Sequence, residues 1–113
     1  YIANAKTDIK VAKQYRFVID LNRTAIGFID LFDYTTTSAG VGVIIAQDYR
    51  NKGFAKEALR LLTDHAFSIL YLFKLHCAIT KDNVASIKLF TSCGFELERE
   101  EQELQYFVKF AIS

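Results

Sequence analysis

The residues with the clearest chemical meaning lie between 41 and 59. There a strand-like run leads into Arg50-x-x-Gly53-x-Ala55 and then into a helical pattern. The first turn of a helix leaves backbone N–H groups unpaired, and these groups point at an incoming anion. Gly53 lets the backbone approach a ligand closely, and Ala55 keeps the first helical turn free of bulk. This spacing predicts a turn that holds a phosphate chain.

Three cations surround the predicted turn, namely Arg50, Lys52 and Lys56. The two lysines are either ordinary surface residues at a helix start or partners of a bound anion. A cation at a helix N-terminus opposes the helix dipole, so an anionic ligand explains the lysines better. A P-loop is a poor explanation, because the lysine and Ser/Thr that follow the second glycine of that motif are absent.

The composition indicates one globular domain. The chain has 113 residues, of which 51% are hydrophobic, and this is enough to build a single core. A formal net charge of +1 argues against nucleic-acid and membrane-surface partners. No apolar run approaches the length of a membrane span. Cys77 and Cys93 lack metal-ligand spacing, so we expect two reduced thiols rather than a disulfide or a metal site, which suggests the cytoplasm.

Hydrophobic periodicity and turn residues predict alternating strands and helices. The expected strands cover residues 15–21, 25–33, 39–45, 75–80, 95–98 and 104–112, the expected helices cover 53–70 and 84–92, and residues 1–7 are expected to end a helix. A tight turn is expected at Asn22-Arg23, and Asp82 or Asn83 is expected to cap the second full helix, with Gly94 ending it. The apolar stripe of the first full helix is Ala55, Ala58, Leu59, Leu62, Ala66, Ile69 and Leu70.

One of these helices joins two strands in the middle of the chain, so those two strands are expected to be parallel. The expected fold class is therefore α/β (α+β). It has a mixed, mostly antiparallel sheet of about six strands with a central strand-helix-strand crossover.

Two full helices are few for a sheet whose central strand is apolar on both faces, because such a sheet needs helices on both faces. We therefore expect part of the fold to precede Tyr1, where the chain begins without a methionine, or to come from a partner chain. The alternative is an exposed apolar sheet face, which favours aggregation.

A second motif follows the crossover, Asn83-x-x-Ser86-x-x-Leu89-Phe90-x-x-Cys93-Gly94-Phe95. With the first motif it resembles the GNAT superfamily of acetyl-CoA-dependent N-acetyltransferases. The similarity is greatest to the branch of spermidine and ribosomal-protein-alanine acetyltransferases. The resemblance implies that residues 1–113 form a single GNAT-like domain. It also implies that this domain lacks the family's N-terminal strand and two helices, with residues 1–6 ending the second of them.

The resemblance implies acetyl-CoA as cosubstrate. The strand backbone at 43–45 would pair with the pantetheine arm, and residues 50–56 would wrap the pyrophosphate. Asn83 would bond the pantetheine, and the helix after it would lie along the far side of the cofactor. The implied cofactor-binding residues are Val43, Ile44, Ile45, Arg50, Asn51, Lys52, Gly53, Phe54, Ala55, Lys56, Asn83, Ser86 and Phe90.

The chain departs from the family at residues that carry catalysis. Many relatives place a tyrosine at the Phe90 position as general acid, and phenylalanine has no proton to give. Losing a general acid costs roughly 10²–10⁴ in rate, yet a thiolate is a tolerable leaving group. Many polyamine enzymes carry a glutamate at the Gly40 position, so one candidate general base is absent too. Tyr106 is a possible replacement acid, although nothing in the spacing requires it, and no catalytic residue is assigned.

Asp30 and Asp33 lie on the strand where spermidine acetyltransferases carry glutamates, so they are the candidate substrate-binding residues. Their odd spacing points them to opposite faces of a regular strand, so at most one faces a shared site. His76 and His65 favour structural roles, His76 as a hydrogen-bonded residue. The acidic run from Glu96 to Glu103 is expected to be a solvated hairpin edge.

These observations predict an N-acetyltransferase that moves an acetyl group to a primary amine by direct attack within a ternary complex. The expected acceptor is a polyamine-like small amine, or else a protein N-terminal amine. We expect no metal, and a homo-oligomer of two or more chains. The alternative is a CoA-binding regulatory or interaction domain without catalysis.

Overall fold

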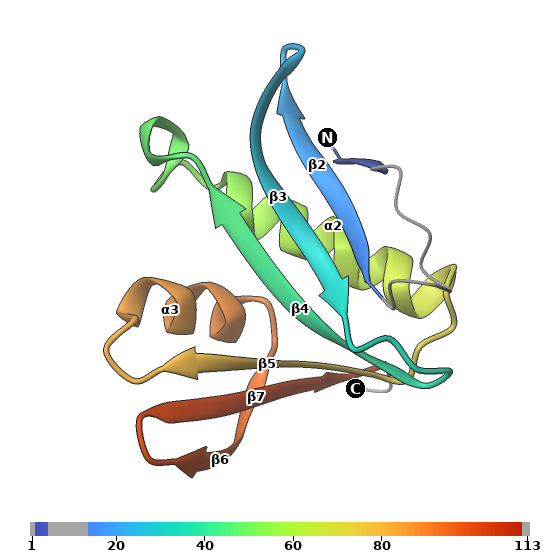
Figure 1. The fold of residues 1–113 in the computed structure, drawn as a ribbon, viewed down its shortest axis with the longest axis vertical. Coiled ribbons are helices and arrows are strands. Elements are labelled where there is room, and N and C mark those ends of the chain that lie inside the picture. Colours follow the sequence, from blue (N-terminus) through green and yellow to red (C-terminus); the bar gives the residue numbers. More distant parts are fainter. Residues whose placement is uncertain (1, 5–13, 112–113) are drawn as a thin grey trace.

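The computed structural model describes residues 2–4 and 14–111 of the chain (Figure 1). Its strands are β1 (Ile2–Asn4), β2 (Tyr15–Leu21), β3 (Thr24–Phe32), β4 (Ser38–Ile45), β5 (Lys74–Thr80), β6 (Glu96–Glu101) and β7 (Leu104–Phe110). Its helices are the short 3₁₀ turn Gln47–Tyr49, α2 (Phe54–Ser68) and α3 (Val84–Ser92).

The described strands form one sheet in the order β1-β2-β3-β4-β5-β7-β6. The pair β4–β5 is parallel and the other neighbouring pairs are antiparallel. The mixed, mostly antiparallel sheet is therefore confirmed, with α2 as the crossover between its parallel strands. β4 takes the central place that its apolar residues predict.

The expectation of a helix end at residues 1–7 is wrong for Ile2–Asn4, which form β1 and raise the described strand count to seven. This short strand pairs antiparallel with β2. The free edge of β2 offers a row of backbone donors and acceptors, and pairing satisfies them whatever the local helix preference. The rest of the expected helix end lies outside the described residues, as does Ile112 of the last expected strand.

The turns follow the sequence closely. Asn22 and Arg23 have φ values of 51° and 68°, the left-handed conformation of a two-residue hairpin turn, and they join β2 to β3 as predicted. β6 and β7 form the expected hairpin, and the β6 edge is exposed throughout. Helix α2 ends two residues before the predicted Leu70. Ile69 is 60% exposed, so its place in the apolar stripe was wrong.

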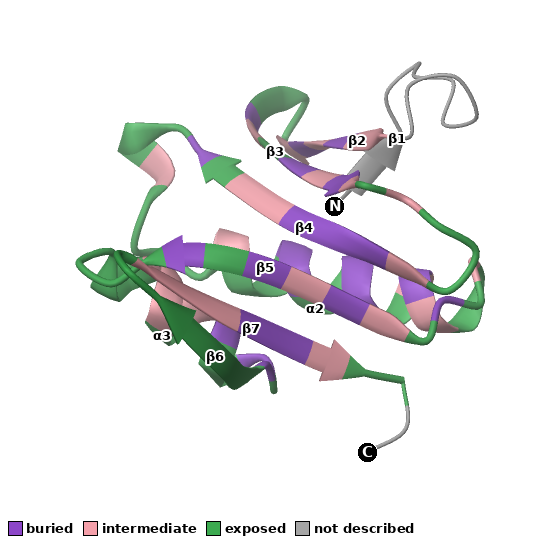
Figure 2. Ribbon diagram, turned by 60° about the horizontal axis from the view of Figure 1, so that its bottom comes forward, coloured by how far each residue is buried: buried purple, intermediate pink, exposed green. Residues whose placement is uncertain are grey.

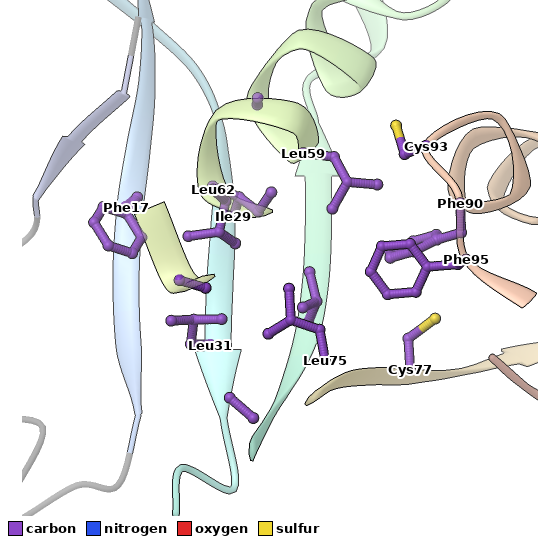
Figure 3. Packing of buried hydrophobic residues seen from close by; sticks show 14 of the residues in the cluster. Phe17, Ile29, Leu31, Leu59, Leu62, Leu75, Cys77, Phe90, Cys93 and Phe95 are labelled. Atoms are coloured by element: carbon purple, nitrogen blue, oxygen red, sulfur yellow. The ribbon is translucent and has the colours of Figure 1, made fainter. Parts of the chain in front are cut away.

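Both α2 and α3 pack on one face of the sheet, where a continuous hydrophobic core forms (Figure 2). Figure 3 shows the centre of this core, with Leu59 of α2 and Phe90 of α3 over the sheet. Cys77 and Cys93 are free, buried thiols in the same core. Among the described residues no helix is both long and apolar enough to cross a membrane.

The other face of the sheet is partly apolar. Phe28 and Ile44 pair across β3 and β4 and are exposed there, with Ile44 at 62%. Next to them Arg16 pairs with Asp30 in an ion pair, and its guanidinium also lies 4.7 Å from the ring centre of Phe28. In the part of the chain that the structure describes, no helix covers this face. The shortage of helices for this face, which the sequence predicts, is thus present in the described residues.

Candidate functional site

Strands β4 and β5 separate soon after they meet. Within the described residues their parallel pairing covers Ser38–Gly40 of β4 and Lys74–His76 of β5. We call the point after the pair Gly40–His76, where the two strands diverge, the fork. Beyond the fork the remainder of β4, Val41 to Ile45, stays paired with β3 on its other side. A strand edge is thus left open inside the sheet, where an extended ligand can add main-chain hydrogen bonds.

The backbone groups on this open edge can be identified from the register. Ala46 N donates to Ile26 O at 2.7 Å, so the alternate residues Ile44 and Gly42 exchange bonds with β3. The N–H and C=O groups of Val43 and Ile45 therefore face the gap. Consistent with this, Ile45 O accepts a bond from Arg50 Nε at 2.9 Å. The carbonyl and amide of Val43 and the amide of Ile45 remain for a ligand.

The turn before α2 has the geometry of an anion site. Gly53 is the N-cap with φ 84°, a left-handed conformation that glycine adopts without strain. An added Cβ at Gly53 would point into open space, and no side chain caps the helix. The bond that closes the first turn runs from Glu57 N to Gly53 O at 3.1 Å. The amides of residues 54–56 precede that bond, so they are free for an anion.

Helix α3 forms the opposite wall. Asn83 Oδ1 accepts a bond from Ser86 N at 3.2 Å, which confirms Asn83 rather than Asp82 as the helix cap. Since the carboxamide oxygen is used for capping, the amide nitrogen of Asn83 is the group left for a ligand. Asn83, Ser86 and Leu89 recur at three-residue spacing and turn one helix face toward the same cavity.

These walls enclose one cavity of about 520 Å³. It is lined by Val43, Ile44, Ile45, Tyr49, Arg50, Asn51, Gly53, Phe54, Ala55, Lys56, Asn83, Ala85, Ser86 and Leu89. The structure thus brings together all the cofactor-binding candidates except Lys52 and Phe90. The predicted phosphate turn and the predicted pantetheine strand face one space.

Lys52 and Phe90 do not line the cavity. Lys52 is exposed, and Phe90 is only 3% exposed within the core. The ring of Phe90 meets Phe95 edge to face at 5.0 Å between ring centres (Figure 3). The sequence analysis missed Tyr49, Ala85 and Leu89. The Asn83 and Ser86 spacing signals Leu89, whereas Tyr49 is brought in by the 3₁₀ turn, where its ring lies 6.3 Å from that of Phe54.

The two acidic candidates are not brought together and neither lines the cavity. Asp30 is engaged by Arg16 through two bonds, Nε to Oδ1 at 2.9 Å and Nη2 to Oδ2 at 3.0 Å. Asp33 lies beyond the end of β3, exposed and with φ 47°. The Arg16 guanidinium therefore compensates the charge of Asp30, the one of these two candidates that lies within a strand.

The fork itself is occupied by Gly40 and His76, the last pair of the parallel ladder. A Cβ on Gly40 would lie 2.3 Å from Cε2 of Phe32, so the Phe32 ring takes the space that a glutamate side chain would need. Burial, followed by the charge of Lys74, lowers the pKa of His76 below its ordinary value of 6.5. The imidazole makes no hydrogen bond to any described group, so the partner of the expected structural histidine is missing.

Burial raises the pKa of the Cys77 thiol to about 12, because the thiolate would be poorly solvated in the core. The thiol is therefore protonated at neutral pH and is a poor nucleophile. In the described part of the chain, no cluster of three His, Cys, Asp or Glu side chains is arranged to hold a metal ion.

Comparison with known proteins agrees with this geometry. Residues 1–96 match the family model of the acetyltransferase (GNAT) domain. The chain is 31% identical over 87 residues to spermidine N(1)-acetyltransferase of Escherichia coli K12, covering 75% of the chain and 47% of the relative. It is 34% identical over 83 residues to the Vibrio cholerae protein of the same name, covering 71% of the chain and 48% of the relative. The chain thus spans about half the length of the curated relatives it matches.

Solved structures show the same fold. Spermidine N-acetyltransferase from Vibrio cholerae, in complex with CoA and spermine, superposes with a TM-score of 0.83 at 28% identity, covering 91% of this chain and 69% of that one. Campylobacter jejuni PseH, in complex with acetyl coenzyme A, gives 0.78 at 23% identity over 86% and 67%, a likeness of fold alone. The open strand edge, the glycine turn and the family match lead to one conclusion: the chain belongs to the GNAT acetyltransferase domain family.

Proposed function

We propose that this domain binds acetyl-CoA in the cavity between β4 and α3 and transfers the acetyl group to a primary amine. The observation that carries the proposal is the convergence of an open strand edge and an uncapped helix N-terminus on one cavity. An extended amide-containing arm and a pyrophosphate are the ligand parts that these two features bind. When bound, acetyl-CoA supplies an acetyl group activated as a thioester.

Each part of the cavity has a distinct task. The free groups of Val43 and Ile45 would hold the pantetheine arm, and the amides of 54–56 would hold the pyrophosphate. Lys56 adds positive charge beside those amides. Gly53 keeps the approach to them clear. The backbone groups and the lysine charge that suit the family's ligand are thus present in this chain.

The transfer would be direct, without an acetylated enzyme. Both cysteines are buried, and the Cys77 thiol is held in its protonated form. The protein then contributes chiefly by positioning the amine and the thioester and by polarising the acetyl carbonyl with a backbone N–H. Phe90 lies in the core and offers no hydroxyl to protonate the leaving thiolate.

The acceptor that we propose is a small polyamine-like amine. The Escherichia coli and Vibrio cholerae relatives are spermidine acetyltransferases, and one Vibrio cholerae structure contains spermine. A protein N-terminal amine is the second candidate of the same class.

The test is release of CoA from acetyl-CoA by the protein in its natural full length. Spermidine, spermine and an alanyl peptide serve as acceptors. We expect turnover with at least one of the polyamines. Lys56→Glu, in the cavity, should raise the KM for acetyl-CoA, while Arg60→Glu, one turn further along α2 and outside the cavity, should not. Tight acetyl-CoA binding without release for any amine would instead establish the CoA-binding module as the function.

We also propose that the chain assembles with copies of itself. One structure of the Vibrio cholerae enzyme is described as dodecameric. Three exposed apolar residues, Ile69, Tyr71 and Phe73, lie on the connection from α2 to β5, and Phe110 of β7 contacts Phe73; we call these four residues the loop patch. The rings of Phe73 and Phe110 lie 5.5 Å apart, and Tyr71 is 81% exposed. Exposed apolar groups gathered in this way are typical of an interface.

A further inference from the structure

The fork between β4 and β5 marks where the reacting end of an extended ligand must stop. A ligand that pairs with β4 from Ile45 toward Val41 runs along about 17 Å of strand before it reaches Gly40. There β5 closes the gap through the pair Gly40–His76. The acetyl group at the end of such an arm would therefore lie beside these two residues.

Among the described residues, the sheet face opposite α2 leaves room for an amine beside Gly42, next to that point. On the α2 face the space is filled by core side chains such as Leu59 and Leu75 (Figure 3). On the opposite face the Phe32 ring covers Gly40, whereas Gly42 of β4 has no side chain and lies clear of that ring. A Cβ on Gly42 would meet nothing closer than Phe32 Cε1 at 3.8 Å. The acceptor must therefore approach from the face opposite α2.

His76 lies on that open face. Side chains alternate along β5, and Leu75 and Cys77 point into the core, so His76 points the other way. Its ring meets Phe32 edge-on at 6.3 Å between centres, a contact that orients the imidazole. No hydrogen bond to a described group occupies either ring nitrogen.

Burial, followed by the charge of Lys74, lowers the pKa of His76 and keeps its imidazole neutral near pH 7. Lys74 on its own strand disfavours the imidazolium, while Asp33 at the end of β3 and Glu98 on β6 favour it less strongly. Oε2 of Glu98 lies 3.4 Å from Nζ of Lys74, so these two charges form an ion pair. Asp30 on β3 forms an ion pair with Arg16. On β7 the nearest titratable residue of the same face is Tyr106, which pairs with Ala78. A neutral imidazole can accept a proton.

We propose that His76 is the general base of the acetyl transfer, an inference that rests on the proposed function. The neutral amine nitrogen attacks the acetyl carbonyl carbon and forms the C–N bond. The C–S bond breaks, and its electron pair leaves on sulfur as the CoA thiolate. The proton that the nitrogen must lose passes to the imidazole of His76. This assignment gives the chain a base in place of the glutamate that Gly40 and Phe32 exclude.

The test compares His76→Gln with the matched control His65→Gln. His65 lies on α2, on the core side of the sheet, where its ring meets Phe17 at 5.7 Å. In the full-length protein with the amine that turns over best, His76→Gln should lower kcat by roughly 10²–10⁴. The KM for acetyl-CoA should stay unchanged. The wild-type kcat should fall as pH drops through a pKa below 6.5, and the variant should lose this acid limb.

Two further readouts separate a base from a structural residue. Added imidazole should restore part of the activity of His76→Gln and none to His65→Gln. An NMR titration of the His76 ring, which needs no turnover, should give a pKa below 6.5 in the protein alone. If wild-type protein transfers acetyl and His76→Gln keeps both its kcat and the acid limb, the base assignment is overturned while the proposed function stands. Absence of transfer by the wild type with every amine overturns both.

Discussion

Single residues matter here mainly through their backbone. Gly53 has φ 84° and leaves the space above the α2 amides open. Val43 and Ile45 offer main-chain groups to the gap, so their side-chain identity is secondary to their position in β4. This explains why a short glycine pattern suffices to predict an anion-binding turn. It also explains why the residues with reactive side chains, such as Cys77, are not part of the cavity.

At this scale the sharpest prediction compares two left-handed glycines. Gly53→Ala and Gly94→Ala should each cost about 1–2 kcal/mol of stability, because both positions have φ near +90°. Only Gly53→Ala should weaken CoA binding, by roughly 10–100-fold, since its Cβ obstructs charge-assisted hydrogen bonds to the pyrophosphate. Isothermal titration with CoA measures the affinity, and thermal unfolding checks the common strain. Equal CoA affinity in the two variants would remove the pyrophosphate from this turn.

At the scale of elements, the site depends on the path of β4. This strand is paired with β3 from Gly40 to Ile45 and leaves β5 after Gly40. The close approach of β3 to β4 requires a glycine, because a Cβ at Gly27 would lie 2.2 Å from Ile44 O. The position of the open edge therefore rests on a residue outside the cavity.

We expect Gly27→Ala to destabilise the fold by about 1–3 kcal/mol, because the added methyl overlaps the backbone of β4. The control is Gly42→Ala on the neighbouring strand, where the new methyl makes ordinary contact with Phe32. That variant should unfold at the same denaturant concentration as wild type or a higher one, since alanine restricts the unfolded chain. Urea unfolding followed by circular dichroism measures both. Equal urea midpoints for the two variants would contradict this prediction, because β4 would then accommodate the methyl group added at Gly27 without loss of stability.

At the scale of the whole molecule, exposed apolar side chains of the described residues include those on the sheet face opposite α2 and those of the loop patch. The acidic β6 edge is different. It carries Glu98, Glu100 and Glu101 in ion pairs with Lys74, Lys81 and Arg99. A charged edge resists strand pairing between chains. The loop patch is thus better suited to association between chains than the β6 edge is.

Tyr71→Lys in the loop patch should therefore shift the protein toward smaller species, because it places a charge within apolar contacts. Leu97→Lys is the control, since Leu97 is also exposed but lies on the β6 edge. Light scattering after size-exclusion chromatography measures the mass of each. A wild-type mass equal to one chain, or a mass that drops only in the Leu97 variant, would reject the loop patch as the interface.

Several turns and helix ends of this protein are determined by short stretches of its sequence. The hairpin turn at Asn22-Arg23, the α3 cap at Asn83 and the left-handed turn at Gly53 depend on backbone conformations that a few neighbouring residues impose. The crossover from β4 to β5 followed from the order of the elements, because a helix between two strands of one sheet makes them parallel. These features sufficed to indicate the family and most of the cavity wall.

Other features were decided by the tertiary structure, because they depend on register and on partners distant in sequence. Arg16 of β2 pairs with Asp30, its cross-strand partner on β3, and so engages a carboxylate that the sequence offered to a substrate. Phe90 turns into the core, although its motif suggested the cofactor. His76 stands at the fork because β4 and β5 part after three pairs, a divergence that no local pattern in either strand records.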